Sequence, residues 1–183
     1  VDHGSDSKAG KGAPGRSVAW VLGGRMAGAK LPPPKLSGRE ALYERVLPGV
    51  DVRVQVRPSG FEQDFVIRDR AAADALAAAG GVFEIPLKTK GLTARPGRSA
   101  EATGGVEFVD AKGAVVSFIP PAEAWDAEVD ARSGEPASKV PVGLTVAQAN
   151  PGNATLSMAT DPDWLADPGR VFPITIDPTY ATK

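Results

Sequence analysis

The stretch YERVLPGVDVRVQVRPSGFEQDFVIRD, residues 43–69, decides the fold. From position 50 to position 57, valines alternate with polar residues. Because successive side chains of a strand point to opposite faces, the valines share one face and the polar residues share the other. Valine also packs well on a pleated surface, since its β-carbon is branched. Residues 50–57 are therefore predicted to form a half-buried β-strand.

Pro58, Ser59 and Gly60 interrupt the alternation and residues 61–67 resume it, which predicts a β-hairpin. With Pro58 and Ser59 as the loop, one register satisfies both faces. That register pairs Val56 with Phe61, Val52 with Phe65 and Val50 with Ile67 on the apolar face, and Arg53 with Asp64 and Gln55 with Glu62 on the polar face. A loop extended through Gly60 brings an apolar residue opposite an acidic one, so the two-residue loop is preferred. Gln63 is the misfit, because it falls on the apolar face.

Composition sets the broad class. A chain of 183 residues is long enough for one domain with a real core. Its formal net charge of −1 gives no electrostatic footprint for nucleic acid or an anionic membrane, so neither is expected as a partner. The 21 glycines and 17 prolines indicate many turns, which suit short strands better than long helices. The chain has no cysteine, which excludes disulfides, thiolate chemistry and cysteine-ligated metals.

Three segments are predicted along the chain. Residues 1–16 are rich in Gly, Ser and Lys and are expected to be a disordered tail or linker. Residues 17–179 are expected to form a single β domain, and residues 180–183 to begin a linker to a following module. No apolar run approaches the roughly 20 residues of a membrane span. No signal peptide is visible, and the sequence starts inside a polar, glycine-rich stretch, so a fragment of a longer protein is expected.

Strand patterns dominate the domain. Short strands are predicted at residues 17–22, 82–87, 92–95, 106–110, 114–119, 122–127, 140–147, 154–159 and 171–176. One short surface helix is expected at about residues 70–79, an alanine-rich run that stops at a glycine pair. A helical turn is expected near residues 161–168, with Asp161 as its cap and Pro162 at its first position. The predicted fold is mostly β, an antiparallel β-sandwich or open barrel.

Side chains suited to catalysis or metal binding are few. The single histidine, His3, lies in the expected tail, where a general base lacks the fixed geometry it needs. Without a fixed histidine there is no Ser-His-Asp triad, and zinc lacks its usual ligands. The glycine-rich stretches do not have the spacing of dinucleotide- or phosphate-binding loops. No catalytic residue, metal or cofactor is therefore predicted, and the protein is not expected to be an enzyme.

Acidic residues leave two alternatives open. A glycosidase needs two carboxylates with separated pKa values, and the candidates are Glu62, Asp64, Glu107, Glu123, Asp126, Asp161 and Asp163. With 22 acidic residues the sequence selects no pair, and solvated strand faces and helix caps explain them more simply. Calcium binding by Asp161, Asp163 and Asp167 is the other alternative. Pro162 and Pro168 interrupt this group, and the Gly and terminal Glu of a helix–loop–helix calcium site are missing.

Three tryptophans are the candidate ligand-binding residues: Trp20, Trp125 and Trp164. Together they can form an aromatic platform for a sugar. Core packing is the simpler explanation in a β domain with few aromatic residues. The exposure of the three rings is expected to decide between these readings.

Several sequence blocks occur in a recognisable order. They are LPPPK at residues 31–35, ALYERVLPGVDVRV at 41–54, GLT at 91–93, PAEAWD at 121–126 and VFPITIDPT at 171–179. Together they resemble a β module of large secreted actinobacterial cell-surface proteins. Those proteins carry RHS/YD repeats, LamG or DNRLRE domains and are akin to wall-associated polymorphic-toxin proteins. The chain departs from this pattern in having Phe172 where the family usually has Tyr.

The resemblance implies a secreted, cell-wall-associated protein whose partners are neighbouring domains of the same chain. The first hypothesis is therefore a non-catalytic structural or adhesion module. The alternative is a carbohydrate-binding or carbohydrate-cleaving domain, with cell-wall or extracellular glycans as partners. A third hypothesis is a plug or chaperone-like domain of an RHS-type toxin. Two close acids in a pocket, one with a strongly raised pKa, would count against the first hypothesis.

Overall fold

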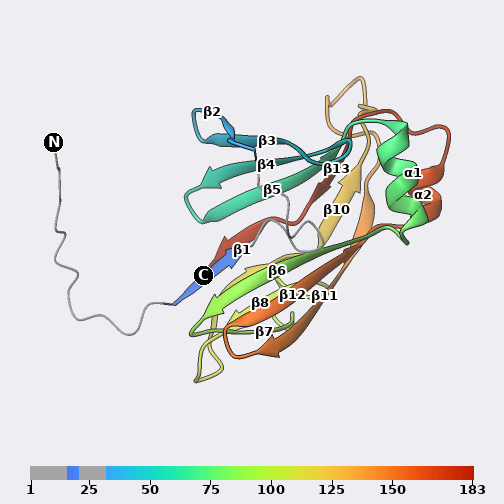
Figure 1. The fold of residues 1–183 in the computed structure, drawn as a ribbon. Coiled ribbons are helices and arrows are strands. Elements are labelled where there is room, and N and C mark those ends of the chain that lie inside the picture. Colours follow the sequence, from blue (N-terminus) through green and yellow to red (C-terminus); the bar gives the residue numbers. More distant parts are fainter. Residues whose placement is uncertain (1–15, 21–31) are drawn as a thin grey trace, which may run out of the picture.

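The computed structural model describes residues 16–20 and 32–183, so the expected tail at residues 1–16 lies outside it except for Arg16. Figure 1 shows a mostly β protein with two short helices at one end. All strand pairs are antiparallel, and the sheet does not close on itself. The predicted fold class is confirmed.

Fourteen strands belong to one connected sheet in the described part of the chain. They are β1 (Ser17–Trp20), β2 (Lys35–Ser37), β3 (Glu40–Leu47), β4 (Val50–Arg57), β5 (Gly60–Ile67), β6 (Val82–Lys90), β7 (Thr93–Pro96), β8 (Val106–Val109), β9 (Val115–Ile119), β10 (Ala122–Trp125), β11 (Val140–Asn150), β12 (Asn153–Ala159), β13 (Ile174–Asp177) and β14 (Tyr180–Thr182). Most of the predicted strands are present, with shifted ends.

The central hairpin forms in the predicted register. β4 and β5 pair so that Val52 lies opposite Phe65 and Arg53 lies opposite Asp64, with a two-residue loop between the strands. Val52 and Phe65 have no exposed surface, so the valine row does face the core. Gln63 is buried on the same face, as its position in the alternation predicts.

The sheet bends over itself, and β11 is the strand that turns from one part to the other. Its first residues pair with β10, and residues 143–150 pair with β12, which continues to β6 and β1. On the other side, β14 joins β5 to β9, and β9 leads through β8 to β7. β7 then approaches β11, where Oε1 of Gln148 accepts a hydrogen bond from the backbone N of Ala94 at 3.0 Å. One glutamine side chain thus bridges an otherwise open seam.

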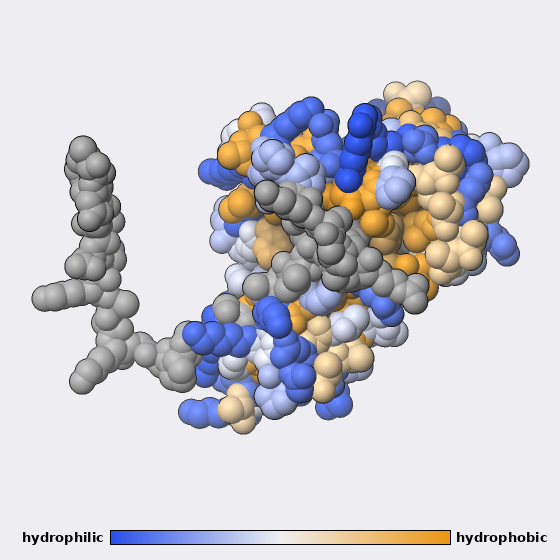
Figure 2. Space-filling view, in the orientation of Figure 1, coloured by the Kyte–Doolittle hydropathy of each residue, from blue (hydrophilic) through white to orange (hydrophobic). Residues whose placement is uncertain are grey.

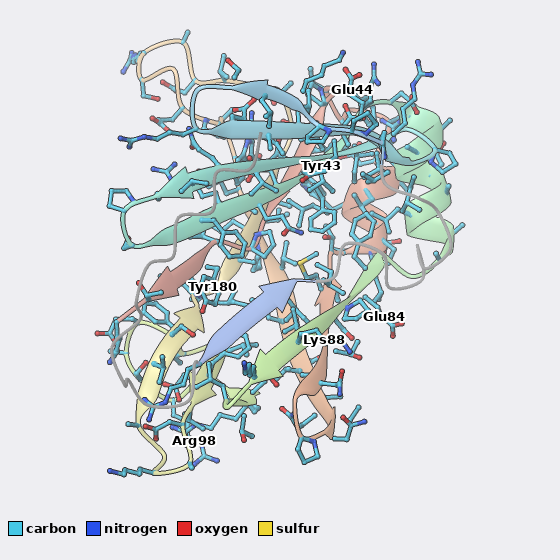
Figure 3. All side chains as sticks on the ribbon, turned by 60° about the vertical axis from the view of Figure 1, so that its left-hand side comes forward. Tyr43, Glu44, Glu84, Lys88, Arg98 and Tyr180 are labelled. Carbon is cyan, nitrogen blue, oxygen red and sulfur yellow. The ribbon has the colours of Figure 1, made fainter. Side chains whose placement is uncertain are left out.

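The core fills the space between the two arms of the sheet that Figure 1 shows above and below it. Phe65 of β5 stacks on Phe83 of β6 with ring centroids 5.1 Å apart, so the two arms contact each other directly. Tyr180 of β14, labelled in Figure 3, is half-buried and stacks on Phe61 with ring centroids 5.0 Å apart. Burying such large apolar side chains contributes about 2 kcal/mol each to folding.

The helices α1 (Arg70–Ala78) and α2 (Pro162–Ala166) lie side by side at one end of the sheet, as Figure 1 shows. Asp69 caps α1, since its side chain accepts from the backbone N of Ala72. Asp161 caps α2 in the same way, which confirms the predicted cap.

Arg70 ties the two helices together. Its guanidinium donates to the carbonyl oxygens of Leu165 and Asp167 at 3.2 and 2.8 Å. These carbonyls belong to the end of α2, where backbone acceptors have no partner within the helix. The same guanidinium lies 5.0 Å from the ring centroid of Phe172.

Several regions differ from the sequence-based expectation, among them β2, which was not predicted as a strand. The last predicted strand starts at Ile174 instead of position 171, because the backbone N of Val171 donates to Oδ2 of Asp126 rather than to a neighbouring strand. The sequence does not predict β14, whose three residues pair only because the fold brings β5 and β9 to either side. The predicted strand at 17–22 continues past Trp20 into residues outside the described part.

Candidate acid–base site

A row of charged side chains crosses the polar face of the sheet. Arg53 of β4 lies opposite Asp64 of β5, and Glu123 of β10 lies opposite Asp177 of β13. The register of β5 with β13 pairs Phe65 with Ile176, so the next position brings Asp64 beside Asp177. The sheet thus sets three carboxylates and one arginine in a line across four strands.

Asp64 is held by Arg53. The Nε of Arg53 donates to Oδ2 of Asp64 at 2.8 Å, and Asp64 is 6% exposed. Burial raises the pKa of Asp64 above its ordinary value, although the hydrogen bond from Arg53 opposes the shift. The pair is therefore a partly desolvated ion pair on a sheet face, with Glu62 and Arg57 forming a second pair next to it.

Among the acids of this row, Asp177 is the one whose pKa departs most from its ordinary value. Burial and, after it, the negative charges of Asp64 and Glu62 together raise the pKa of Asp177 to about 6. A hydrogen bond of 2.8 Å from Oγ1 of Thr179 to Oδ1 of Asp177 acts in the opposite direction. A carboxyl group with this pKa exists in both protonation states near neutral pH, so it can accept or donate a proton.

The seven acidic residues named from the sequence end up in four places. Asp64 lies in the row beside Asp177, which sequence reasoning missed, and Glu62 lies two residues before Asp64 on the same face of β5. Glu123 is also in the row, but its Oε2 accepts from Lys139 at 3.1 Å. The signal for Asp177 was present in the alternation of β13, which puts Asp177 on the same face as Thr175.

Of the other four acids, Glu107, Asp126 and Asp161 have structural partners. Glu107 is buried against Arg95, and Asp126 is buried against Arg170 at 3.2 Å. Asp161 and Asp163 lie at the start of α2, where Oδ1 of Asp161 accepts from the backbone N of Asp163 at 2.9 Å.

The aspartates considered for calcium are used in turns and caps. Oδ1 of Asp167 accepts from the backbone N of Gly169 at 2.8 Å, and Oδ2 accepts from Arg170 at 3.0 Å. Over residues 16–20 and 32–183, no three acidic or histidine side chains are grouped so that they could hold a metal ion. His3 lies outside that range.

The tryptophans lie on different elements. Trp125 is in β10 and Trp164 is in α2, and both rings are half-buried. Lys139 lies 5.3 Å above the ring centroid of Trp125, and Arg170 lies 5.0 Å above that of Trp164. A cation therefore already covers one face of each ring. Trp20 pairs with Leu87 through its backbone, and its side chain lies outside the description. Ligand binding by the three tryptophans stays a prediction.

Neither α1 nor α2 has the length and apolar character that a helix needs to cross a membrane; the search covered the described residues.

Comparison with known proteins links the chain to nucleases. It is 28% identical over 145 residues to the tRNA nuclease WapA of Bacillus subtilis strain 168. It matches the tRNA(Glu)-specific nuclease WapA of Bacillus subtilis subsp. natto and the tRNA3(Ser)-specific nuclease WapA of Bacillus spizizenii to the same extent. Each match covers 79% of this chain and 6% of the relative's length. No family model matches the chain, and no solved structure matches it significantly.

These relatives overturn two expectations from the sequence. A non-catalytic structural or adhesion module was expected, and the protein was not expected to be an enzyme. Both expectations are wrong, because curated proteins similar over 79% of the chain are named tRNA nucleases. The carbohydrate-binding alternative receives no support from these names. The expected association with a toxin agrees with them.

Proposed function

We propose that this chain is a domain of a tRNA-nuclease toxin. The observation that carries the proposal is the match over 145 residues to three proteins named as nucleases specific for tRNA. Because the chain spans only about 6% of the length of those relatives, the activity is proposed for the longer polypeptide to which the chain belongs. The secreted, wall-associated location implied by the sequence resemblance is part of the same proposal.

The carboxylate row is the place in this chain to look for chemistry. In metal-independent RNA cleavage a base takes the proton of a ribose 2′-hydroxyl as the 2′-oxygen forms a bond to phosphorus. The bond from phosphorus to the 5′-oxygen breaks, and the leaving oxygen takes a proton from an acid or from water. A carboxylate with a pKa of about 6, as on Asp177, is suited to that proton transfer near neutral pH. On the same face of the sheet, Arg53 and Arg57 of β4 form ion pairs with Asp64 and Glu62.

The test uses the full-length polypeptide that contains this chain, incubated with tRNA, beside the 183-residue chain alone. Cleavage of tRNA by the full-length protein is expected. Its absence under conditions where the protein is folded would refute the proposal. An Asp177→Asn variant of the full-length protein then locates the chemistry. A loss of at least about a hundredfold in cleavage rate assigns the base to this chain. An unchanged rate assigns it to another part of the polypeptide.

Export is tested separately. Cell fractionation of the producing organism is expected to recover the polypeptide in the medium or the wall fraction. Recovery in the cytosol alone would contradict the proposed location.

A further inference from the structure

The turn between β3 and β4 forms a ridge with a hollow on each side. Leu47 and Pro48 line both hollows. The first hollow, of about 610 Å³, has Arg45 and Arg68 in its wall. The second, of about 270 Å³, lies between the ridge, α1 and the start of β6, and most of its lining is apolar: Val50, Ala75, Leu76, Val82 and Phe83 are among its residues.

The ridge is held rigidly against α1. Gly49 has φ of +69°, and a Cβ on it would lie 2.6 Å from the Cβ of Ala72. The carbonyl oxygen of Gly49 accepts from the backbone N of Arg68 at 2.8 Å. Arg45 has φ of +55°, an uncommon conformation for a residue with a side chain, and its backbone N donates to Oδ1 of Asp51 at 2.7 Å. Both hollows are therefore preformed.

Positive charge is available at one end of this surface. Arg45 is exposed, and within the described ranges its guanidinium makes no ion pair or side-chain hydrogen bond. The neighbouring Glu44 is occupied by Lys35 at 2.7 Å. Arg68 lies 3.7 Å from Asp51, and the charges of Arg68 and Arg45 both help to lower the pKa of Glu44. The two arginines can thus accept an acidic partner.

Negative charge is available at the other end. Glu84 lines the apolar hollow on the side of β6 and is exposed, and no described residue forms an ion pair with it. It points outward near the foot of the helical end in Figure 3. Between the charges, Val82 is 40% exposed and α1 presents alanines to solvent at positions 71, 75, 78 and 79. Figure 2 shows this end of the molecule mainly in orange and tan.

We propose that the ridge and its two hollows bind a segment of the same longer polypeptide, apolar in the middle, acidic at one end and basic at the other. The acidic end contacts Arg45 and Arg68, the apolar side chains fill the hollow beside Leu76, and the basic end contacts Glu84. This inference rests on the proposed function, which places the chain inside a much longer polypeptide. RNA fits the surface less well, because the one aromatic ring of the hollow, Phe83, is 6% exposed and offers no stacking face.

The first experiment measures binding of short fluorescent peptides to the 183-residue chain by polarisation. The probe has glutamates at one end, leucines in the middle and lysines at the other end. It is expected to bind at least about tenfold more tightly than a peptide of the same composition in which the leucines are dispersed. Equal affinities, or no binding by either peptide, would overturn the proposal.

Variants then test the charges and the hollow. The double variant Arg45→Glu, Arg68→Glu is expected to bind the probe about tenfold more weakly. It is also expected to prefer a peptide with lysines at both ends. Ala75→Glu is expected to weaken every leucine-containing peptide, while Arg132→Glu, in an exposed loop, is the matched control with no effect. If the double arginine variant does not change its preference, the charge assignment is wrong.

The source of the segment is tested by photo-cross-linking from position 75 in the full-length polypeptide. A cross-link within one chain supports the proposal, and a cross-link only between chains refutes it. A different result would make RNA the ligand of this surface instead of a peptide. In that case no peptide binds the unmodified chain, and the double arginine variant loses binding to tRNA. Because tRNA cleavage is measured independently, failure of the docking surface leaves the nuclease proposal standing.

Discussion

Arg95 donates through Nε to Oε2 of Glu107 at 3.0 Å, and Glu107 has no exposed surface. Oε1 of the same carboxylate accepts from the backbone N of Ser99 at 2.7 Å. Despite the opposing effect of burial, these hydrogen bonds hold the pKa of Glu107 at about 2. The carboxylate thus fastens the loop after β7 to β8.

Glu107→Ala is expected to lower the free energy of unfolding by about 2 kcal/mol at pH 7, because it leaves Arg95 and Ser99 without their acceptor. Since the pKa of Glu107 is about 2 in the fold, its contribution is present above the unfolded pKa of 4.5 and is lost as pH falls toward 2. Urea unfolding of both proteins at pH 7 and pH 3 measures this. A difference that did not shrink at the lower pH would contradict the assignment.

Asp177→Asn is expected to stabilise the protein at pH 7.5 by about 1 kcal/mol. This value already includes a reduction for the partial solvent exposure of the carboxyl group. The pKa of Asp177 rises from 3.8 to about 6 on folding, so the folded state holds the proton more tightly than the unfolded state. Ionisation between these values therefore weakens the fold as pH rises. Thermal unfolding at pH 7.5 and pH 3.5 checks this, and the two proteins should be nearly equal at pH 3.5. If the two proteins were equally stable at pH 7.5 as well as at pH 3.5, the pKa of Asp177 would not be raised in the folded state.

Gln63→Met is expected to stabilise the protein by about 1 kcal/mol. The Nε2 of Gln63 is buried without a hydrogen-bond partner, and a thioether of similar shape removes that unsatisfied donor. Chemical denaturation of the two proteins measures the change. Gln55→Met, on the polar face of β4, is a control in which no gain is expected. A loss of stability on substituting Gln63 would show that its side chain has a partner in solution.

Gly49→Ala is expected to destabilise the protein by about 2 kcal/mol, through the positive φ and the contact of a new Cβ with Ala72 at 2.6 Å. The double variant with Ala72→Gly removes the contact but keeps the backbone strain, so it should recover part of the loss after allowance for glycine in a helix. Gly38→Ala is the control, since it has φ of +57° but nothing within 4 Å. Equal losses for Gly49→Ala and Gly38→Ala would show that packing on α1 is unimportant.

The register of the central hairpin could be predicted because every pair follows from one alternating pattern and one turn. Asp161 as a cap could be predicted in the same way, since its partner lies two residues away. Asp177 could not be singled out, because its raised pKa depends first on burial in the fold and then on the charges of Asp64 and Glu62, which lie more than a hundred residues earlier in the chain. The sequence shows which residues lie on the polar face of β13, but it does not show that β5 is the strand beside β13.

The sequence by itself determined most of the strands and the absence of cysteine chemistry, because alternation, turn residues and composition act over a few neighbouring positions. Only the tertiary structure decided that β14 enters between β5 and β9, that Arg70 closes the end of α2, and that the LPG turn becomes a ridge against α1. Each of these depends on segments distant in sequence meeting in space. Their pairing is fixed by packing of the whole core, which no short stretch of residues encodes.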